Sequence, residues 1–160
     1  MKTKEKAPKI SVLMPVYNGE RYLKLAVDSI LQQSFTDFEF IIINDGSSDG
    51  SEALIKSYGD ERIVYVENEQ NLGLIKTLNK GLMLAQGEYI ARMDCDDICH
   101  PERFAMQTAF LNQHLDHVVV ASSYRLIDEE GATLKIKVKP MDDTQVKWVS
   151  MFRTAIEHPV

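Results

Sequence analysis

Three aspartates stand close together at the end of a hydrophobic segment of this 160-residue chain. Asp94, Asp96 and Asp97 follow the sequence EYIARM and precede Pro101, a residue type that favours the first turn of a helix. A single aspartate before a helix is commonly an N-cap, but three neighbouring carboxylates repel one another unless a positive charge lies among them. Carboxylate oxygens are ligands that Mg²⁺ and Mn²⁺ prefer. The segment therefore has two interpretations, a helix cap and a cation site.

Two further polar clusters follow hydrophobic segments. PVYN (15–18) ends the first apolar run, and NDGSSD (44–49) ends the second. Taken alone, each is typical of a turn, with Asn18 as an N-cap in the first and Asx and glycine residues in the second. In open α/β sheets, however, ligands bind outside the carboxyl ends of the strands. Because all three clusters fall at such ends, we predict that they face one crevice.

The hydrophobic pattern predicts the elements that position these clusters. Apolar runs rich in β-branched residues predict buried strands, and apolar residues spaced three or four positions apart predict the helices between them. The alternation of the two predicts an α/β fold with a mostly parallel sheet. The predicted strands cover 9–16, 38–45, 62–66, 88–93 and 117–123, and the predicted helices cover 22–31, a short segment after 49, 75–85 and 101–115.

Several residues are expected to mark helix ends. Asp49 and Glu52 have the spacing of a capping box, and Gly87 is expected to be the C-cap glycine of the helix before it. Beyond the fifth strand, apolar residues alternate with Thr and Lys over 133–139, which predicts one strand of an antiparallel hairpin. A last helix is predicted from about residue 142.

Composition and charge narrow the possible classes of protein. With 44% hydrophobic and 26% charged residues, we expect one globular domain over 9–160 after a flexible N-terminus, 1–8. The net charge of −6 argues against a nucleic-acid partner, although a divalent cation could still bridge an acidic protein to a phosphorylated ligand. The sequence contains neither a signal peptide nor an apolar run long enough to cross a membrane. Cys95 and Cys99 indicate reduced thiols in a cytosolic setting.

Common motifs of other enzyme classes are absent from the sequence. It has no Walker phosphate loop and no G-x-G-x-x-G after the first strand. Cys95, Cys99 and His100 do not have a standard zinc-ligand spacing. Ser47 and Ser48 lack the G-x-S-x-G context of a nucleophilic serine.

In combination, the segments SVLMPVYNGERYL, FEFIIINDGSSD, NLGLIKTLNKGLMLAQGEYIARMDCDD and PERFAMQ closely resemble the inverting family 2 glycosyltransferases. The resemblance runs in order across roughly residues 9–110. It implies a GT-A fold, which is a Rossmann-like three-layer sandwich with a mostly parallel central sheet, here with an antiparallel hairpin near the C-terminus. The first half of such a domain binds a nucleotide-sugar donor.

The resemblance also implies roles for individual residues. Tyr17 would pack against the nucleobase, and Asp45 would accept a hydrogen bond from the base, typically uracil. Asp94 would contact the ribose or the metal shell, and Asp96 would ligate the Mn²⁺ or Mg²⁺ that bridges the diphosphate, while Asp97 matches a further aspartate of the family. The other residues implied at the donor site are Pro15, Val16, Asn18, Lys76 and Cys95, the last in the variable middle position of a D-x-D motif.

Transfer with inversion needs more than a donor site. Negative charge develops on the leaving diphosphate, where a divalent cation stabilises it, and a general base must deprotonate the acceptor hydroxyl. The resemblance places that base in a later Glu-Asp segment, which we do not find in this sequence. The acidic residues at 128–130 fall in the predicted hairpin turn, and Glu157 lies near the end of the chain.

We therefore expect the general base to lie beyond Val160, the last residue of the sequence. The catalytic residue itself is not identified by this expectation. The chain would then be a truncated domain, lacking the part that binds the acceptor and supplies the base. Such a domain is expected to bind donor but to transfer sugar poorly by itself.

The leading hypothesis is metal-dependent transfer of a sugar from a UDP-sugar to a glycan or lipid-linked acceptor during synthesis of a cell-surface polysaccharide. One alternative is a non-catalytic module that binds nucleotide sugars. A nucleotidyltransferase is less favoured because MPVYNGE lacks the glycine-rich basic loop of that class. We expect a cytoplasmic location, and attachment to the inner face of the plasma membrane through regions outside this chain stays open.

Overall fold

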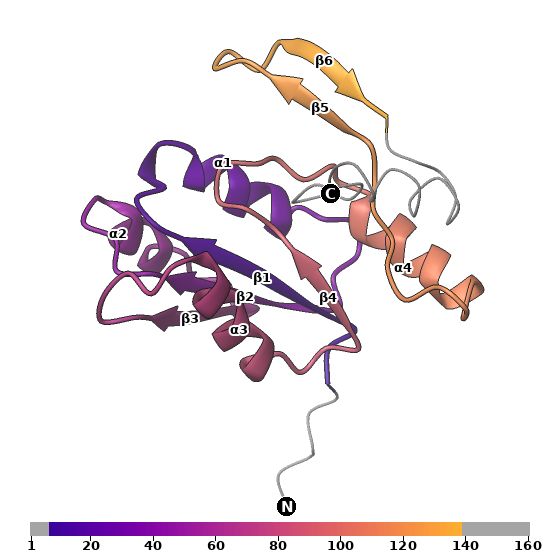
Figure 1. Cartoon of the computed structure of the whole chain (residues 1–160), viewed down its shortest axis with the longest axis horizontal. Coiled ribbons are helices and arrows are strands. Elements are labelled where there is room, and N and C mark those ends of the chain that lie inside the picture. Colours follow the sequence, from indigo (N-terminus) through magenta and orange to yellow (C-terminus); the bar gives the residue numbers. More distant parts are fainter. Residues whose placement is uncertain (1–6, 139–160) are drawn as a thin grey trace, which may run out of the picture. The chain divides into compact units, whose positions relative to one another are not determined.

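The computed structural model describes residues 7–138, which form two compact units divided after Thr108 (Figure 1). Strands and helices alternate through the first unit, and the second unit contains an antiparallel hairpin.

Some of the sequence predictions fall outside the described residues. These are the flexible N-terminus over residues 1–6, the helix from about 142, and the acidic residue Glu157. Val160, beyond which the general base is expected, also lies outside them. The structure therefore does not test the prediction that the base lies beyond Val160, and the catalytic residue stays unassigned.

The order of elements follows the prediction up to the fourth strand. None of the helices within residues 7–138 has the length and apolar character needed to span a membrane. The elements are β1 (Ile10–Val16), α1 (Glu20–Leu31), β2 (Phe38–Asn44), α2 (Ser51–Lys56), β3 (Ile63–Glu67), α3 (Leu74–Leu84), β4 (Tyr89–Arg92), α4 (Arg103–Gln113), β5 (Tyr124–Ile127) and β6 (Thr133–Lys137).

Strand β1 lies at the centre of the parallel sheet, whose order is β3-β2-β1-β4. Ile10 stands opposite Phe38 of β2 and Tyr89 of β4, so the three strands start in register. All residues of β1 are buried, as are nearly all those of β2. Continuous apolar runs of this kind suit strands that are covered on both faces, and the predicted mostly parallel sheet is confirmed.

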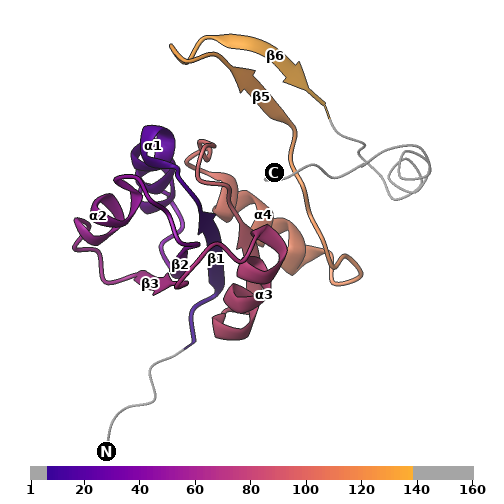
Figure 2. The same ribbon diagram turned by 60° about the vertical axis from the view of Figure 1, so that its left-hand side comes forward.

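Helices cover both faces of this sheet, which confirms the predicted three-layer arrangement (Figure 2). Alternate residues of β1 point to opposite faces. Val12 and Met14 pack in the larger core with Leu23 of α1 and Ile55 of α2. On the other face, Leu13, Ile41 and Ile43 pack with Leu78 and Ala85 from α3 and its end. The sheet is therefore a rigid platform from which the loops at its carboxyl end project.

The predicted fifth strand at 117–123 is wrong, because the structure has no strand there. Val118 and Val119 are 91% and 59% exposed. A strand forms only where its N–H and C=O groups meet a partner, and within the described residues the sheet ends at β4. The β-branched residues of this segment favour an extended backbone, but they do not provide a neighbouring strand to pair with.

The predicted hairpin is confirmed by the antiparallel pair β5 and β6. The acidic residues at 128–130 lie in its turn, as expected. Asp128 Oδ1 accepts the N–H groups of Ala132 (2.7 Å) and Glu130 (3.1 Å), and Gly131 has a φ of 83° that favours glycine. The carboxylate of Asp128 is therefore part of the turn.

Two predicted helix ends differ in the structure. Helix α4 begins at Arg103, two residues after Pro101, so Pro101 is not the first helical residue. Gly87 is not a C-cap, because α3 already ends at Leu84 with Ala85 as its cap. A glycine is needed at 87 for a different reason: a Cβ there would lie 2.4 Å from the backbone N of Ser11.

The close approach at Gly87 predicts a large effect of adding one carbon. Gly87→Ala should destabilise the chain by about 1–3 kcal/mol, the usual cost of overpacking, because the added Cβ meets backbone rather than a movable side chain. Urea denaturation of the 160-residue chain measures this change. Gly59→Ala is the matched control, since a Cβ at 59 has no atom within 4 Å. Equal stability of the two variants would contradict the prediction.

Candidate functional site

The loop after β1 and the loop after β2 are joined by hydrogen bonds at the carboxyl end of the sheet. The N–H of Asn18 donates to Ser47 Oγ (3.0 Å), and Asn18 Oδ1 accepts the N–H of Ser48 (2.9 Å). Asn18 has a φ of 51°, a conformation that asparagine tolerates better than most residues. The prediction that Asn18 caps α1 is wrong, because Gly19 holds the cap position and the Asn18 side chain binds the other loop.

The first turns of α1 and α2 are capped from each other's loops. Asp49 Oδ2 accepts the N–H of Glu20 (3.0 Å), and Ser51 Oγ accepts the N–H of Gly19 (3.0 Å). In return, Glu20 Oε2 accepts the N–H of Gly50 (2.9 Å). The first N–H groups of a helix have no partner within the helix. This exchange satisfies them and ties the two loops together.

The predicted capping box of α2 is wrong, because Gly50 and not Asp49 holds the N-cap position. Asp49 Oδ1 accepts the N–H of Ser51 (3.0 Å), but Glu52 pairs with Lys56 instead of returning to the backbone of Asp49. Burial raises the pKa of Asp49, and the hydrogen bonds from Ser51 and Glu20 outweigh it, so the pKa lies below its ordinary value. Asp49 therefore serves both helices as an ionised cap.

Asp45 lies directly after β2, where the sequence predicted it, and organises the loop that follows β3. Its side chain is buried (3% exposed). Oδ1 accepts hydrogen bonds from Asn68 Nδ2 (2.7 Å) and the N–H of Leu72 (2.9 Å), and Oδ2 accepts the N–H of Gly73 (3.0 Å). Burial raises the pKa of Asp45, but these hydrogen bonds, together with one from the Thr77 hydroxyl, lower it below its ordinary value. Residues 68–73 are thus folded around an ionised carboxylate.

Sequence reasoning missed two members of this network, Asn68 and Lys80. Asn68 follows β3 and is buried. Its Nδ2 also donates to Thr77 Oγ1 (3.2 Å), and its Oδ1 accepts from Lys80 Nζ (2.6 Å). The signal that could have identified Asn68 is the polar segment ENEQN, a fourth polar cluster at the carboxyl end of a strand.

The three aspartates after β4 differ in their surroundings. Asp94 forms an ion pair with Arg92 (2.9 and 3.3 Å to Nη2), whereas Asp96 is exposed. Burial raises the pKa of Asp97 to about 6, helped by the charges of Asp96 and Asp94 and opposed by Arg103 and Arg92. The segment therefore holds negative charge that its arginines do not fully compensate.

This uncompensated charge fits a divalent cation. Arg92 Nε, by contrast, is a buried donor without a hydrogen-bond partner in the described part of the chain, and such a donor needs an acceptor oxygen rather than a cation. Residues 7–138 contain no cluster of three or more His, Cys, Asp or Glu side chains that could hold a metal by themselves. A cation here would have one or two carboxylate ligands, from Asp96 and Asp94, and would take its other ligands from a bound diphosphate, as Mg²⁺ commonly does.

Cys95 connects this segment to the loop after β1. A Cβ built on Gly19 would lie 2.9 Å from Cys95 Sγ, so the thiol occupies the space that the glycine leaves. Burial, with a smaller effect from Asp96, raises the pKa of Cys95. The thiol is therefore a neutral packing group between two loops.

The remaining predicted donor-site residues fall into buried and exposed groups. Pro15 and Val16 are buried at the end of β1, and Val16 O accepts the N–H of Asp45 (2.7 Å). Tyr17 is 51% exposed, and its role at a donor site stays a prediction. Lys76 is exposed in the first turn of α3, the helix whose start Asp45 holds.

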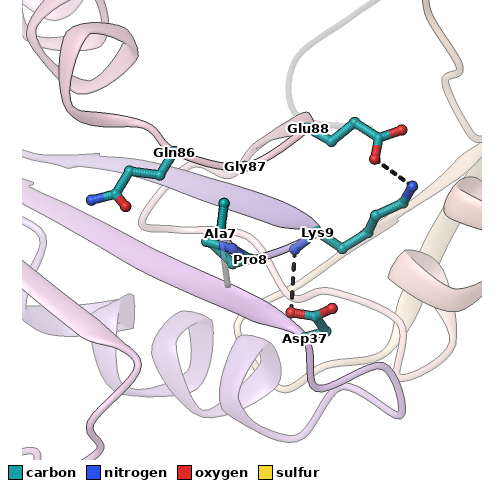
Figure 3. Close-up of a pocket in the computed structure, with 7 residues that line it drawn as sticks. All are labelled: Ala7, Pro8, Lys9, Asp37, Gln86, Gly87 and Glu88. Atoms are coloured by element: carbon teal, nitrogen blue, oxygen red, sulfur yellow. Dashed lines mark hydrogen bonds and ion pairs between the residues drawn. The ribbon is translucent and has the colours of Figure 1, made fainter. Parts of the chain in front are cut away.

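A pocket lies at the opposite end of the sheet, around the amino ends of β1 and β4 (Figure 3). Lys9 Nζ pairs with Glu88 (2.6 Å), and the N–H of Lys9 donates to Asp37 Oδ1 (3.3 Å). Ligands of open α/β sheets bind at the carboxyl ends of the strands, so this pocket is not the predicted site. Its lining residues are Ala7, Pro8, Lys9, Asp37, Gln86, Gly87 and Glu88.

The reciprocal caps predict that Asp49 and Glu20 are energetically coupled. Asp49→Ala should cost about 1–2 kcal/mol, as loss of an N-cap commonly does, because it leaves the N–H groups of Glu20 and Ser51 without acceptors. Glu20→Ala should cost less in the Asp49→Ala background than in the wild type, since one of the bonds that hold the two loops together is then already lost. A double-mutant cycle by urea denaturation measures this coupling, and strictly additive effects would contradict it.

The hydrogen bonds to Asp45 predict a pH-dependent contribution to stability. Because the folded-state pKa lies below the ordinary value of 3.8, ionised Asp45 adds stability that is present above that value and lost as the pH falls through the folded pKa. Asp45→Asn should lower the free energy of unfolding by about 2–4 kcal/mol near pH 7, since the amide cannot accept all these donors. Thermal unfolding from about pH 7 to about pH 3 should show the difference shrinking towards acid. A difference that stays constant with pH would argue against an ionised Asp45.

Comparison with known proteins identifies relatives of this chain. EpsE of Bacillus subtilis, named as a glycosyltransferase, is 41% identical over 127 residues, which are 78% of this chain and 46% of that protein. The uncharacterized glycosyltransferase MJ1057 of Methanocaldococcus jannaschii is 40% identical over 132 residues, 80% of this chain and 46% of that protein. The chain spans less than half the length of these relatives.

A solved structure has the same fold. The fragment 1–349 of S. aureus TarS, in complex with UDP-GlcNAc, matches with a TM-score of 0.64 and 25% identity over 74% of this chain and 40% of that one. The model of the family described as glycosyl transferase family 2 matches residues 11–155. The chain therefore belongs to glycosyl transferase family 2, a family of enzymes that transfer glycosyl groups, and its described part has the α/β architecture of the GT-A fold.

Proposed function

We propose that this chain is the donor-binding part of an enzyme that transfers a sugar from a UDP-sugar to an acceptor hydroxyl with inversion, assisted by Mn²⁺ or Mg²⁺. The observation that carries the proposal is the meeting of three loops at the carboxyl end of the sheet, joined through Asn18, Asp49 and Cys95. The complex of TarS with UDP-GlcNAc supports a UDP-sugar as donor.

Tyr17 and Asp45 would receive the nucleoside. The half-exposed ring of Tyr17 offers a flat apolar surface on which a base can stack. Asp45 would accept a hydrogen bond from the base, as the family resemblance implies. Its carboxylate already holds Leu72, Gly73 and Asn68, so a base would meet an acceptor whose orientation is set before binding.

Asp96 and Asp94 would hold the cation and, through it, the diphosphate. A bound Mn²⁺ or Mg²⁺ would act as a Lewis acid that stabilises charge on the departing diphosphate. Asp96 is exposed and needs no rearrangement to serve as a ligand. Asp94 would exchange its contact with Arg92 for the cation, and the freed guanidinium would then be available to pair with phosphate oxygens.

The general base would lie beyond Val160, and the acceptor site would lie outside residues 7–138. Of the acidic residues predicted in the hairpin turn, Asp128 is engaged by Ala132 and Glu130. We extend the proposal to a glycan or lipid-linked acceptor and to synthesis of a cell-surface polysaccharide. The free thiols of Cys95 and Cys99 support a cytoplasmic location, because they suit a reducing compartment.

A non-catalytic module that binds nucleotide sugars is the second candidate. The two candidates differ in outcome for the longer protein: an enzyme releases UDP from a UDP-sugar in the presence of acceptor, whereas a binding module does not.

Calorimetric titration of the 160-residue chain with UDP, in Mn²⁺ and in EDTA, tests the donor site. We expect affinity for UDP to fall at least about tenfold without cation, because the carboxylates then repel the diphosphate. Asp96→Ala should cause a similar loss in Mn²⁺ but no loss in EDTA, where removing a carboxylate relieves repulsion of the diphosphate. Glu61→Ala, at the amino end of β3, is the matched control.

Two results would contradict parts of this proposal. Binding that is independent of cation, or unaffected by Asp96→Ala, would exclude the metal bridge. Failure of UDP, GDP and dTDP to bind a folded sample would exclude the donor site itself.

A further inference from the structure

Lys80 is linked to the buried carboxylate of Asp45 through a single side chain. Lys80 Nζ donates to Asn68 Oδ1 (2.6 Å), and Asn68 Nδ2 donates to Asp45 Oδ1 (2.7 Å). Lys80 Nζ also donates to Glu67 O (3.0 Å), which holds the ammonium beside the end of β3. The charges of Lys80 and Asp45 are therefore connected across one amide.

The ammonium of Lys80 and the carboxylate of Asp45 together fix which way the amide of Asn68 points. An ammonium group only donates hydrogen bonds, so it must face the carbonyl oxygen of the amide. The NH₂ group of Asn68 then faces Asp45 and Thr77, whose oxygens accept from it. Without Lys80, the oxygen of the Asn68 amide loses this charged donor, and the amide is held on one side alone, by Asp45 and Thr77.

Asp45 depends on this arrangement because it is a buried anion. Its hydrogen-bond partners among residues 7–138 are neutral groups: the Asn68 amide, the Thr77 hydroxyl and the N–H groups of Leu72 and Gly73. Buried charges normally have a compensating charge or a full set of hydrogen bonds. Lys80 brings a positive charge to this network, which it contacts through Asn68 and not through Asp45 itself.

We propose that Lys80 is a positioning residue for the nucleoside of the donor, acting through Asn68 to hold Asp45 and residues 68–73 in the arrangement that the base meets. This inference rests on the proposed UDP-binding function. A purely structural lysine would contribute to stability alone. A positioning lysine affects binding of the nucleoside and leaves binding of the diphosphate by Asp96 and Asp94 unchanged.

Titration of the 160-residue chain with two probes separates these roles. Lys80→Met keeps the length of the side chain and removes the ammonium. It should weaken binding of UDP in Mn²⁺ about tenfold and leave binding of inorganic pyrophosphate in Mn²⁺ unchanged. Lys80→Arg should restore most of the UDP affinity, because a guanidinium also donates to Asn68 Oδ1. Lys24→Met, an exposed substitution on α1, is the control.

Nuclear magnetic resonance supplies a readout that stability alone would not move. In Lys80→Met, the side-chain NH₂ signals of Asn68 should shift, and the carboxyl of Asp45 should titrate at higher pH than in the wild type. If Lys80→Met does not fold, Lys80→Leu serves the same comparisons, since it also removes the group that donates to Asn68.

The outcomes distinguish this inference from the proposed function. Wild-type affinity for UDP in the folded variant, or equal loss of UDP and pyrophosphate binding, would overturn the positioning role. If the wild type itself binds pyrophosphate but not UDP, or neither, the proposed donor site is wrong independently of Lys80.

Discussion

Side-chain hydrogen bonds to backbone N–H groups hold together the functional end of this sheet. Apolar packing fixes the strands and helices, but the loops that leave β1, β2 and β3 have little apolar surface of their own. Their backbone N–H groups find partners in side chains. The bonds to Asp45 are partly buried, where an unsatisfied N–H costs about as much as a lost hydrogen bond, and those that Asp49 and Glu20 accept between the first two loops are exposed. Asp49 and Glu20 supply these partners between the first two loops, and Asp45 supplies them for the third.

The same bonds place acceptor groups where a donor nucleotide would bind. A carboxylate that accepts several N–H bonds stays ionised even when buried, which explains the lowered pKa of Asp45. After β4, carboxylates lie close together with incomplete compensation, and Asp97 has a raised pKa. One end of the sheet thus contains a hydrogen-bonded anion, Asp45, where we propose that the nucleoside binds, and a group of incompletely compensated carboxylates, where we propose that the cation binds. This difference between the two groups of carboxylates is the physical basis for proposing separate nucleoside and cation parts of the donor site.

Much of the fold could be predicted because strands and helices leave local or periodic patterns of apolar residues in the sequence. The buried runs of β1 and β2 and the helical spacing in α1 predicted elements that the structure confirms, and the turn of the hairpin was found in the same way. The segment 117–123 failed because strand propensity does not specify a partner. Gly87 is not the predicted C-cap. Position 87 requires glycine because a side chain there would meet the backbone of Ser11, a residue distant in the chain.

The sequence by itself determined the family, the parallel sheet and the carboxyl-end positions of Tyr17, Asp45 and Asp96, because these follow from motif order and strand position. Tertiary structure alone decided which partners those residues have. Asn18 and Asp49 cap across loops rather than within their own helices, Asp94 meets Arg92, and Lys80 reaches Asp45 through Asn68. Each of these contacts forms because polar groups that are brought close together by the fold need hydrogen-bond partners. The spacing of residues along the chain does not show which groups the fold brings together.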